Sequence, residues 1–137
     1  MGALAADTQI LIWSDKDVVT ARQQGRAMAL QTGFSVSEAT LIATAISELA
    51  RNIVSYANQG SVTLKPVHGP NGTTGLTIVA SDSGPGIADV NLALRDGYSS
   101  SGGLGLGLPG VRRLMDEFDI ASGAGRGTTV TVTKWLP

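Results

Sequence analysis

The sequence predicts an α/β (α+β) fold of two layers, in which a mixed, mostly antiparallel sheet is covered on one face by helices. Apolar residues recur at helical spacing in separate segments, and elsewhere they alternate in strands that are grouped as hairpins. The 137 residues contain neither an internal repeat nor a linker, and a chain that is 42% hydrophobic and 15% charged can bury one core. We therefore expect a single domain over residues 1–137.

The composition argues against several classes of function. Lys and Arg number 10 against 11 Asp and Glu, and this net charge of -1 removes the electrostatic case for binding nucleic acid or a membrane. Without cysteine the chain has neither a disulfide framework nor a thiolate metal site. The N-terminus does not read as a signal peptide, and no apolar run is long enough to span a bilayer. We expect a cytoplasmic protein.

The chain begins with a predicted strand and helix. Residues 8–14 alternate as a short strand does, with apolar groups on both sides. Asp15 or Asp17 can cap a helix that runs to about Thr32, and Gly33 should stop it. The buried stripe of this helix should consist of Val18, Ala21, Gly25 and Met28.

A second helix and a hairpin follow. Ser35 and Glu38 form a capping box, and the helix that they start should end by Gly60. Its apolar stripe consists of Ile42, Ile46, Leu49 and Ile53. Beyond it the periodicity changes to that of strands, over residues 61–67 and 75–81. The second strand should place Leu76, Ile78 and Ala80 on its inward face.

The C-terminal part predicts helices and a last pair of strands. Residues 89–95 suit a short helix, and an amphipathic helix begins at Pro109 and continues through Phe118. Strands over residues 120–122 and 128–136 close the chain, joined by a glycine-rich turn.

Glu48 and Asn52 lie one turn apart on the second predicted helix, so their side chains point the same way. A carboxylate and a carboxamide at this spacing suit an acid or base together with a Mg²⁺ ligand, because hard cations take oxygen donors. The alternative is an exposed polar pair on an amphipathic helix, and the two residues alone do not exclude it.

Asp82 continues the inward alternation of its strand and is followed by the sharp turn that contains Gly84 and Gly86. A carboxylate that faces the helix layer is costly unless it is paired, and an acceptor beside bare backbone suits the exocyclic amine of adenine. An ordinary Asp-Ser-Gly turn at a strand end is the alternative.

Glycines between residues 102 and 107 lead into the helix that begins near Pro109. Free N–H groups and a helix N-terminus suit phosphate, although a plain surface loop has the same composition. The sequence has no Gly-Lys-Ser/Thr motif, and Gly105, Gly107 and Gly110 match the dinucleotide motif without the apolar strand that it needs. The absence of H-R-D and D-F-G excludes the eukaryotic protein-kinase fold.

Taken in order, ELARN, DSGPG, GLGLG and GTT resemble the boxes of the Bergerat (GHKL) ATP-binding fold, which gyrase, Hsp90, histidine kinases and MutL share. They occupy residues 48–52, 82–86, 103–107 and 127–129. More narrowly, almost the whole chain resembles the RsbT-type serine/threonine switch kinases of the stressosome, a branch close to the RsbW and SpoIIAB anti-sigma factor kinases.

The resemblance implies a role for each matching residue. Glu48 would be the general base, Asn52 would hold Mg²⁺, and Asp82 would accept a hydrogen bond from the adenine of ATP or ADP. Thr128 should point into the pocket beside Asp82, because it shares a strand face with Val130 and Val132. The remaining nucleotide contacts that it implies are Gly84, Gly86, Ile87, Ser100, Gly102, Gly103, Leu104, Gly105, Leu106, Gly107 and Leu108.

The resemblance also implies partners. The substrate would be a serine or threonine of a STAS-domain protein of the RsbS kind, held in a stressosome scaffold of the RsbR kind. The freed kinase would then activate a PP2C-type phosphatase of the RsbU kind. An alternative remains open, in which the chain is a nucleotide-gated anti-sigma factor that binds a sigma factor and an anti-anti-sigma STAS protein.

Overall fold

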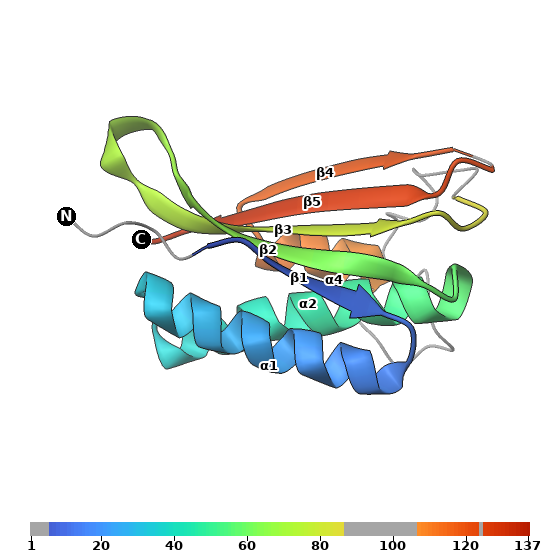
Figure 1. The fold of residues 1–137 in the computed structure, drawn as a ribbon. Helices are drawn as coiled ribbons and strands as arrows, with labels where there is room; N and C mark the ends of the chain where they lie inside the picture. Colours follow the sequence, from blue (N-terminus) through green and yellow to red (C-terminus); the bar gives the residue numbers. More distant parts are fainter. Residues whose placement is uncertain (1–5, 87–106, 124) are drawn as a thin grey trace.

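The two-layer arrangement is confirmed in a computed structural model, which describes residues 6–86, 107–123 and 125–137. A five-stranded sheet of order β1-β2-β3-β5-β4 carries its helices on one face (Figure 1). Every strand pair in these residues is antiparallel, which agrees with the expected mostly antiparallel sheet and shows no parallel pair in the described ranges. The short helix expected over residues 89–95 lies outside the described residues.

The first strand, β1 (Thr8–Ile12), leads into helix α1 (Asp15–Thr32), and Gly33 ends this helix with a φ of 119°, as predicted. The expected cap was wrong by one residue or more, because the N-cap is Ser14. Asp17 instead accepts hydrogen bonds at its Oδ2 from the backbone N–H groups of Trp13 (2.9 Å) and Ser14 (3.2 Å). Its carboxylate therefore secures the entry to α1 from the first turn.

Helix α2 (Val36–Tyr56) begins with the predicted capping box, in which Ser35 and Glu38 exchange hydrogen bonds of 3.1 Å. The helix ends earlier than expected, and Gly60 is the first residue of β2 (Gly60–His68). The left-handed Asn58, at a φ of 69°, turns the chain in between. Gly60 is needed there for close packing, since a Cβ atom would lie 2.4 Å from the carbonyl oxygen of Ser81.

The predicted hairpin is confirmed. Strand β2 pairs with β3 (Thr74–Asp82) through a turn of 3₁₀ helix, η1 (Pro70–Gly72). Gly60 lies opposite Asp82 in this register, and a Cβ atom at Gly60 would lie 2.9 Å from Ile53 Cγ2, so this end of the hairpin lies beside α2. The inward residues Leu76, Ile78 and Ala80 are buried, as expected.

The C-terminal part follows the order α4 (Gly107–Leu114), β4 (Glu117–Ser122) and β5 (Thr128–Trp135). The prediction that the last helix includes Phe118 was wrong, because Phe118 lies in β4 opposite Val132. Two contacts with β5 end the helix early. Lys134 Nζ donates to the carbonyl oxygen of Leu114 (3.1 Å), and the Asp116 N–H donates to that of Thr133 (2.9 Å).

The core lies between the sheet and its helices. Its largest fully buried side chains are Ile12, Ile42, Ile46, Leu49, Leu64, Leu76, Ile78, Val62, Val111 and Val132. Helices α1 and α2 approach closely at Gly25, where a Cβ atom would lie 2.1 Å from Ile46 Cδ1. None of the helices in the described ranges is long and apolar enough to cross a membrane.

Candidate functional site

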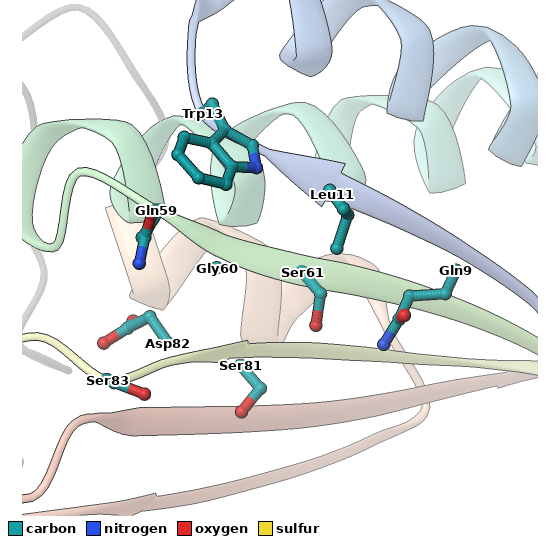
Figure 2. Close-up of a pocket in the computed structure, with 9 residues that line it drawn as sticks. All are labelled: Gln9, Leu11, Trp13, Gln59, Gly60, Ser61, Ser81, Asp82 and Ser83. Atoms are coloured by element: carbon teal, nitrogen blue, oxygen red, sulfur yellow. The ribbon is translucent and has the colours of Figure 1, made fainter.

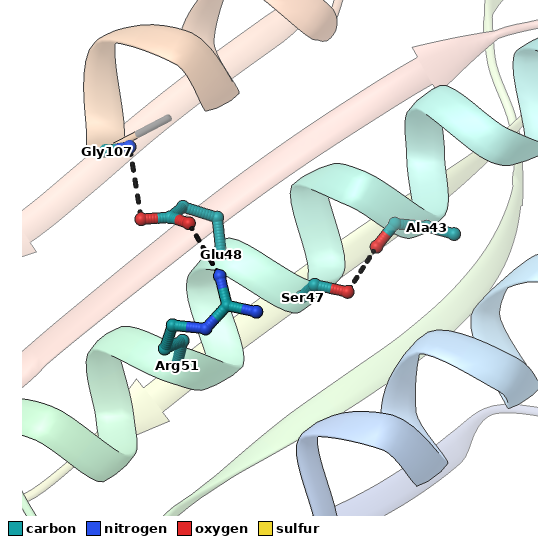
Figure 3. A network of polar contacts seen from close by, with 5 residues as sticks. All are labelled: Ala43, Ser47, Glu48, Arg51 and Gly107. Carbon is teal, nitrogen blue, oxygen red and sulfur yellow. Dashed lines mark hydrogen bonds and ion pairs between the residues drawn. The ribbon is translucent and has the colours of Figure 1, made fainter. Parts of the chain in front are cut away.

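Glu48 on α2 is buried rather than exposed, with 2% of its surface accessible. Its Oε1 accepts a hydrogen bond from the backbone N–H of Gly107 (3.1 Å), and its Oε2 accepts one from Nη1 of Arg51 (3.2 Å; Figure 3). A buried carboxylate is costly unless charged and hydrogen-bonding partners compensate it. The interpretation of Glu48 as half of an exposed polar pair was therefore wrong, and the helix holds a carboxylate inside the protein.

Asn52 presents a buried oxygen one turn further along α2. Its Oδ1 accepts no hydrogen bond from the residues that the structure describes. A buried carboxamide oxygen without a donor costs free energy, and a hard cation is a partner that would compensate it. In the described ranges no group of three or more His, Cys, Asp or Glu residues could hold a metal. Phosphate oxygens and water are further ligands that a cation at Asn52 could take.

Asp82 lies at the end of β3, where its side chain is half-buried. Its Oδ1 accepts the N–H of Gly84 at 2.9 Å, so the Asp-Ser-Gly turn that we considered as an alternative is present. The turn uses one carboxylate oxygen, and Oδ2 accepts no hydrogen bond from the described part of the chain. The same carboxylate can therefore hold the loop with one oxygen and a ligand with the other.

The loop after Asp82 is packed tightly on both sides. A Cβ atom at Gly84 would lie 2.5 Å from Ala57 Cβ at the end of α2. A Cβ atom at Gly86, where φ is 78°, would lie 2.0 Å from the carbonyl oxygen of Gly123. Chain packing alone therefore requires both glycines, and it brings the DSGPG box against the end of α2, Gly123 and Gly127.

Thr128 lies directly opposite Asp82 across β3 and β5, on the strand face of Val130 and Val132, as expected. Its Oγ1 is bonded to Ser122 Oγ at 2.8 Å. Thr129 is on the other face, where its hydroxyl meets that of Ser81 at 3.1 Å. The register of the sheet thus brings the GTT box beside the DSGPG box.

The glycine-rich box is described only at its end. The Gly107 N–H, which we expected to bind phosphate, donates to Glu48 in this structure, and Leu108 is buried in the core. The other predicted contacts of this segment lie outside the described residues: Ile87, Ser100, Gly102, Gly103, Leu104, Gly105 and Leu106.

An open pocket of about 310 Å³ lies next to Asp82, on the side of the sheet that the helices leave open (Figure 2). Gln9, Leu11, Trp13, Gln59, Gly60, Ser61, Ser81, Asp82 and Ser83 line it. Leu11 and Trp13 are exposed there, by 58% and 64%. Glu48, Asn52 and Thr128 do not line this pocket, so it is distinct from the nucleotide pocket that we expected between the layers.

Sequence reasoning missed Arg51 and Ser122. Arg51 follows Glu48 by three residues, and opposite charges at this spacing on a helix were a signal for the ion pair. Ser122 gave no signal of its own, because its contact with Thr128 depends on the register of β4 and β5.

Residues 13–134 match the model of the histidine kinase-like ATPase domain family. The serine/threonine-protein kinase RsbT of Bacillus subtilis is 50% identical over 127 residues, which cover 93% of this chain and 95% of RsbT. The anti-sigma F factor of Caldanaerobacter subterraneus is 29% identical, and that of Thermoanaerobacter sp. is 31% identical. Each of these matches covers 85% of this chain and 83% of the relative.

Solved structures show the same fold at lower identity. The crystal structure of RsbU and RsbW domains from Mycobacterium tuberculosis superposes with a TM-score of 0.63 at 22% identity, over 97% of this chain and 34% of that chain. A histidine kinase domain from Erythrobacter litoralis gives a TM-score of 0.51 at 20% identity, over 88% of this chain and 59% of that chain.

Proposed function

The chain belongs to the histidine kinase-like ATPase domain family and, within it, to the RsbT-type serine/threonine protein kinases, and we propose that it phosphorylates a STAS-domain protein. The observation that supports this most is the pair on α2, where the buried carboxylate of Glu48 lies one turn from an Asn52 oxygen that accepts no hydrogen bond from the described residues. Phosphoryl transfer demands positioning and charge neutralisation more than covalent chemistry, and such a pair can supply both.

In the proposed reaction, Glu48 takes the proton of the attacking serine or threonine hydroxyl. Its Oε1 now accepts from the Gly107 N–H, so a hydroxyl that reaches this oxygen replaces or shares that donor. Asp82 orients the nucleotide by accepting from the adenine amine at Oδ2, while Oδ1 keeps the turn closed. Asn52 would hold Mg²⁺, which supplies charge neutralisation to the phosphates when it is bound.

The proposed partners follow from the family membership. The substrate is a STAS-domain protein of the RsbS kind, in a scaffold of the RsbR kind, and the freed kinase activates a PP2C-type phosphatase of the RsbU kind. The relative with 50% identity is a kinase of this type, and that supports stress-signalling partners of this class. We further propose that residues 1–137 are one kinase domain, of which residues 13–134 match the family, and that it works in the cytoplasm where ATP is available.

A second candidate is a nucleotide-gated anti-sigma factor, which the identity of 29% to 31% with anti-sigma F factors favours. The identity of 50% to the kinase outweighs it. In this second function the same nucleotide site would control the binding of a sigma factor.

The proposal is tested by incubating the chain with ATP, Mg²⁺ and each STAS-domain protein encoded near it, followed by intact mass measurement. We expect one STAS protein to gain a single phosphate, and the gain to disappear when EDTA replaces Mg²⁺. If no STAS protein gains phosphate and a sigma factor instead binds tightly in the presence of nucleotide, the second candidate is correct and the kinase proposal fails.

A further inference from the structure

Arg51 is a cationic partner of the carboxylate to which we assign the base role. Its Nη1 lies 3.2 Å from Oε2 of Glu48, and the two side chains are 41% and 3% exposed. The guanidinium thus reaches from the surface of α2 to a carboxylate that water barely contacts. Figure 3 shows it on one side of Glu48, with the Gly107 N–H on the other.

The two carboxylate oxygens have different kinds of partner. Oε2 is bound by a charged side chain from the same helix, three residues away, whereas Oε1 is bound by a backbone N–H from the start of α4. Because residues 48 and 51 share one rigid helix, the pair keeps its spacing when other segments move. The contact of Oε1 depends on how α4 lies against α2, and it can change without altering the ion pair.

We infer that Arg51 is a positioning residue of the kinase, which holds Oε2 of Glu48 and leaves Oε1 to receive the proton of the substrate hydroxyl. This inference rests on the proposed function. In the structure the Gly107 N–H donates to Oε1, which is the contact that we expect the substrate hydroxyl to make. Arg51 fixes the rotation of the carboxylate through its contact with Oε2, so that Oε1 faces the donor in every turnover.

A merely structural role for Arg51 makes a different prediction. If the guanidinium only compensated a buried charge, its removal would lower the folded fraction, and each folded molecule would react at the normal rate. If Arg51 positions the base, folded molecules that bind nucleotide normally would react slowly, because a displacement of about 1 Å can cost about 100-fold in rate.

The test compares Arg51→Gln and Arg51→Lys with Arg26→Gln, a control at an exposed arginine of α1. The acceptor is the STAS protein that the unmodified chain phosphorylates. Rates are divided by the concentration of sites that bind a fluorescent ATP analogue with Mg²⁺. We expect kcat to fall about 10- to 100-fold in Arg51→Gln and less in Arg51→Lys, while the KM for ATP changes less than about threefold.

A second readout does not depend on activity. Amide hydrogen exchange at Gly107 reports the Oε1 contact, and we expect Arg51→Gln to accelerate it without nucleotide, while Arg26→Gln leaves it unchanged. In a Glu48→Gln background, Arg51→Gln should change the residual rate less than about twofold, because Glu48→Gln has already removed the carboxylate that Arg51 positions.

The failures of the two proposals are distinguishable. A normal rate per site and unchanged Gly107 exchange in Arg51→Gln would overturn this inference, provided that Glu48→Gln is inactive. A fully active Glu48→Gln variant would instead overturn the base assignment on which the inference rests.

Discussion

Glu48 and Asn52 lie one turn apart, but their buried oxygens differ in the hydrogen-bond donors that surround them. The carboxylate of Glu48 has donors from Arg51 and Gly107, whereas Oδ1 of Asn52 is buried and has none in the described ranges. Protein contacts explain how the charge of Glu48 is tolerated. No donor in the described ranges compensates the free energy cost of burying Asn52 Oδ1. A bound cation would compensate it, so we expect the ligand at this atom.

Substitutions of Asn52 and of Glu48 should therefore have different effects on the Kd for ATP. We expect Asn52→Ala to raise the Kd for ATP at least about tenfold when Mg²⁺ is present, because it removes the cation ligand. With EDTA, its Kd should equal that of the unmodified chain. Glu48→Gln should bind Mg²⁺ and ATP within about threefold of the unmodified chain, because the base acts on the acceptor. Isothermal calorimetry measures each of these Kd values, and equal effects of both substitutions would contradict the assignment.

The Oδ2 atom of Asp82 should determine the choice of base. Guanine presents a carbonyl where adenine presents an amine, and an acceptor left against an acceptor costs about 1 to 3 kcal/mol. We expect the unmodified chain to bind ATP at least about tenfold more tightly than GTP, and Asp82→Asn to weaken ATP binding by about tenfold.

The control for Asp82 is Asp119→Asn, which removes an exposed carboxylate from β4 and should leave both affinities unchanged. Equal binding of ATP and GTP by the unmodified chain would remove Asp82 from base recognition.

At the level of helices and strands, the sequence predicted most of the features that depend on neighbouring residues, such as helix ends and strand faces. The capping box of Ser35, the stop at Gly33 and the alternation of β3 were confirmed, because each depends on a few neighbouring residues. The end of α4 was not predictable in this way. Residues 116–118 continue the helical pattern of the sequence. They leave the helix because Asp116 hydrogen-bonds to Thr133, and Phe118 pairs with Val132 of β5.

For the candidate site, too, features set by neighbouring residues were predictable, and features set by contacts between distant elements were not. Its candidate residues were proposed from their motifs, and the strand face that places Thr128 beside Asp82 was predicted from the alternation of β5. The burial of Glu48 and its contact with Gly107 were missed, since both depend on how α4 packs on α2. Contacts between elements distant in sequence leave no periodic signal in either one.

The turn after β3 offers a test of the packing that assembles the site. Gly86 and Gly125 have nearly the same φ, 78° and 76°, but a Cβ atom would meet the Gly123 carbonyl only at Gly86 and has open space at Gly125. We expect Gly125→Ala to lower the free energy of unfolding by about 1 to 2 kcal/mol, the cost of a left-handed alanine. Gly86→Ala should cost about 1 to 3 kcal/mol more.

Urea unfolding measures this difference, and nucleotide affinity should fall only in Gly86→Ala because only that substitution displaces the loop of Asp82. Equal destabilisation by the two alanines would show that the DSGPG loop is not held by its contact with Gly123.

At the scale of the whole molecule, antiparallel register brings residues that are far apart in the sequence to one end of the fold. Strands β3 and β5 set Asp82 opposite Thr128, and α2 ends against the loop after β3 (Figure 1). The helices cover one face of the sheet, and the candidate site combines residues of α2 with residues at the ends of β3 and β5. A fold of this kind supports many functions, and the claim of kinase activity therefore depends on the site residues themselves.

We propose that Glu48 serves as the base in phosphoryl transfer from ATP. The most direct measurement is rapid-quench transfer of the γ-phosphate to the STAS protein in a single turnover, with unmodified chain and Glu48→Gln both saturated with Mg²⁺ and ATP. We predict a loss of about 100- to 10,000-fold in the transfer rate at equal nucleotide occupancy. Transfer by Glu48→Gln at the rate of the unmodified chain would contradict the account.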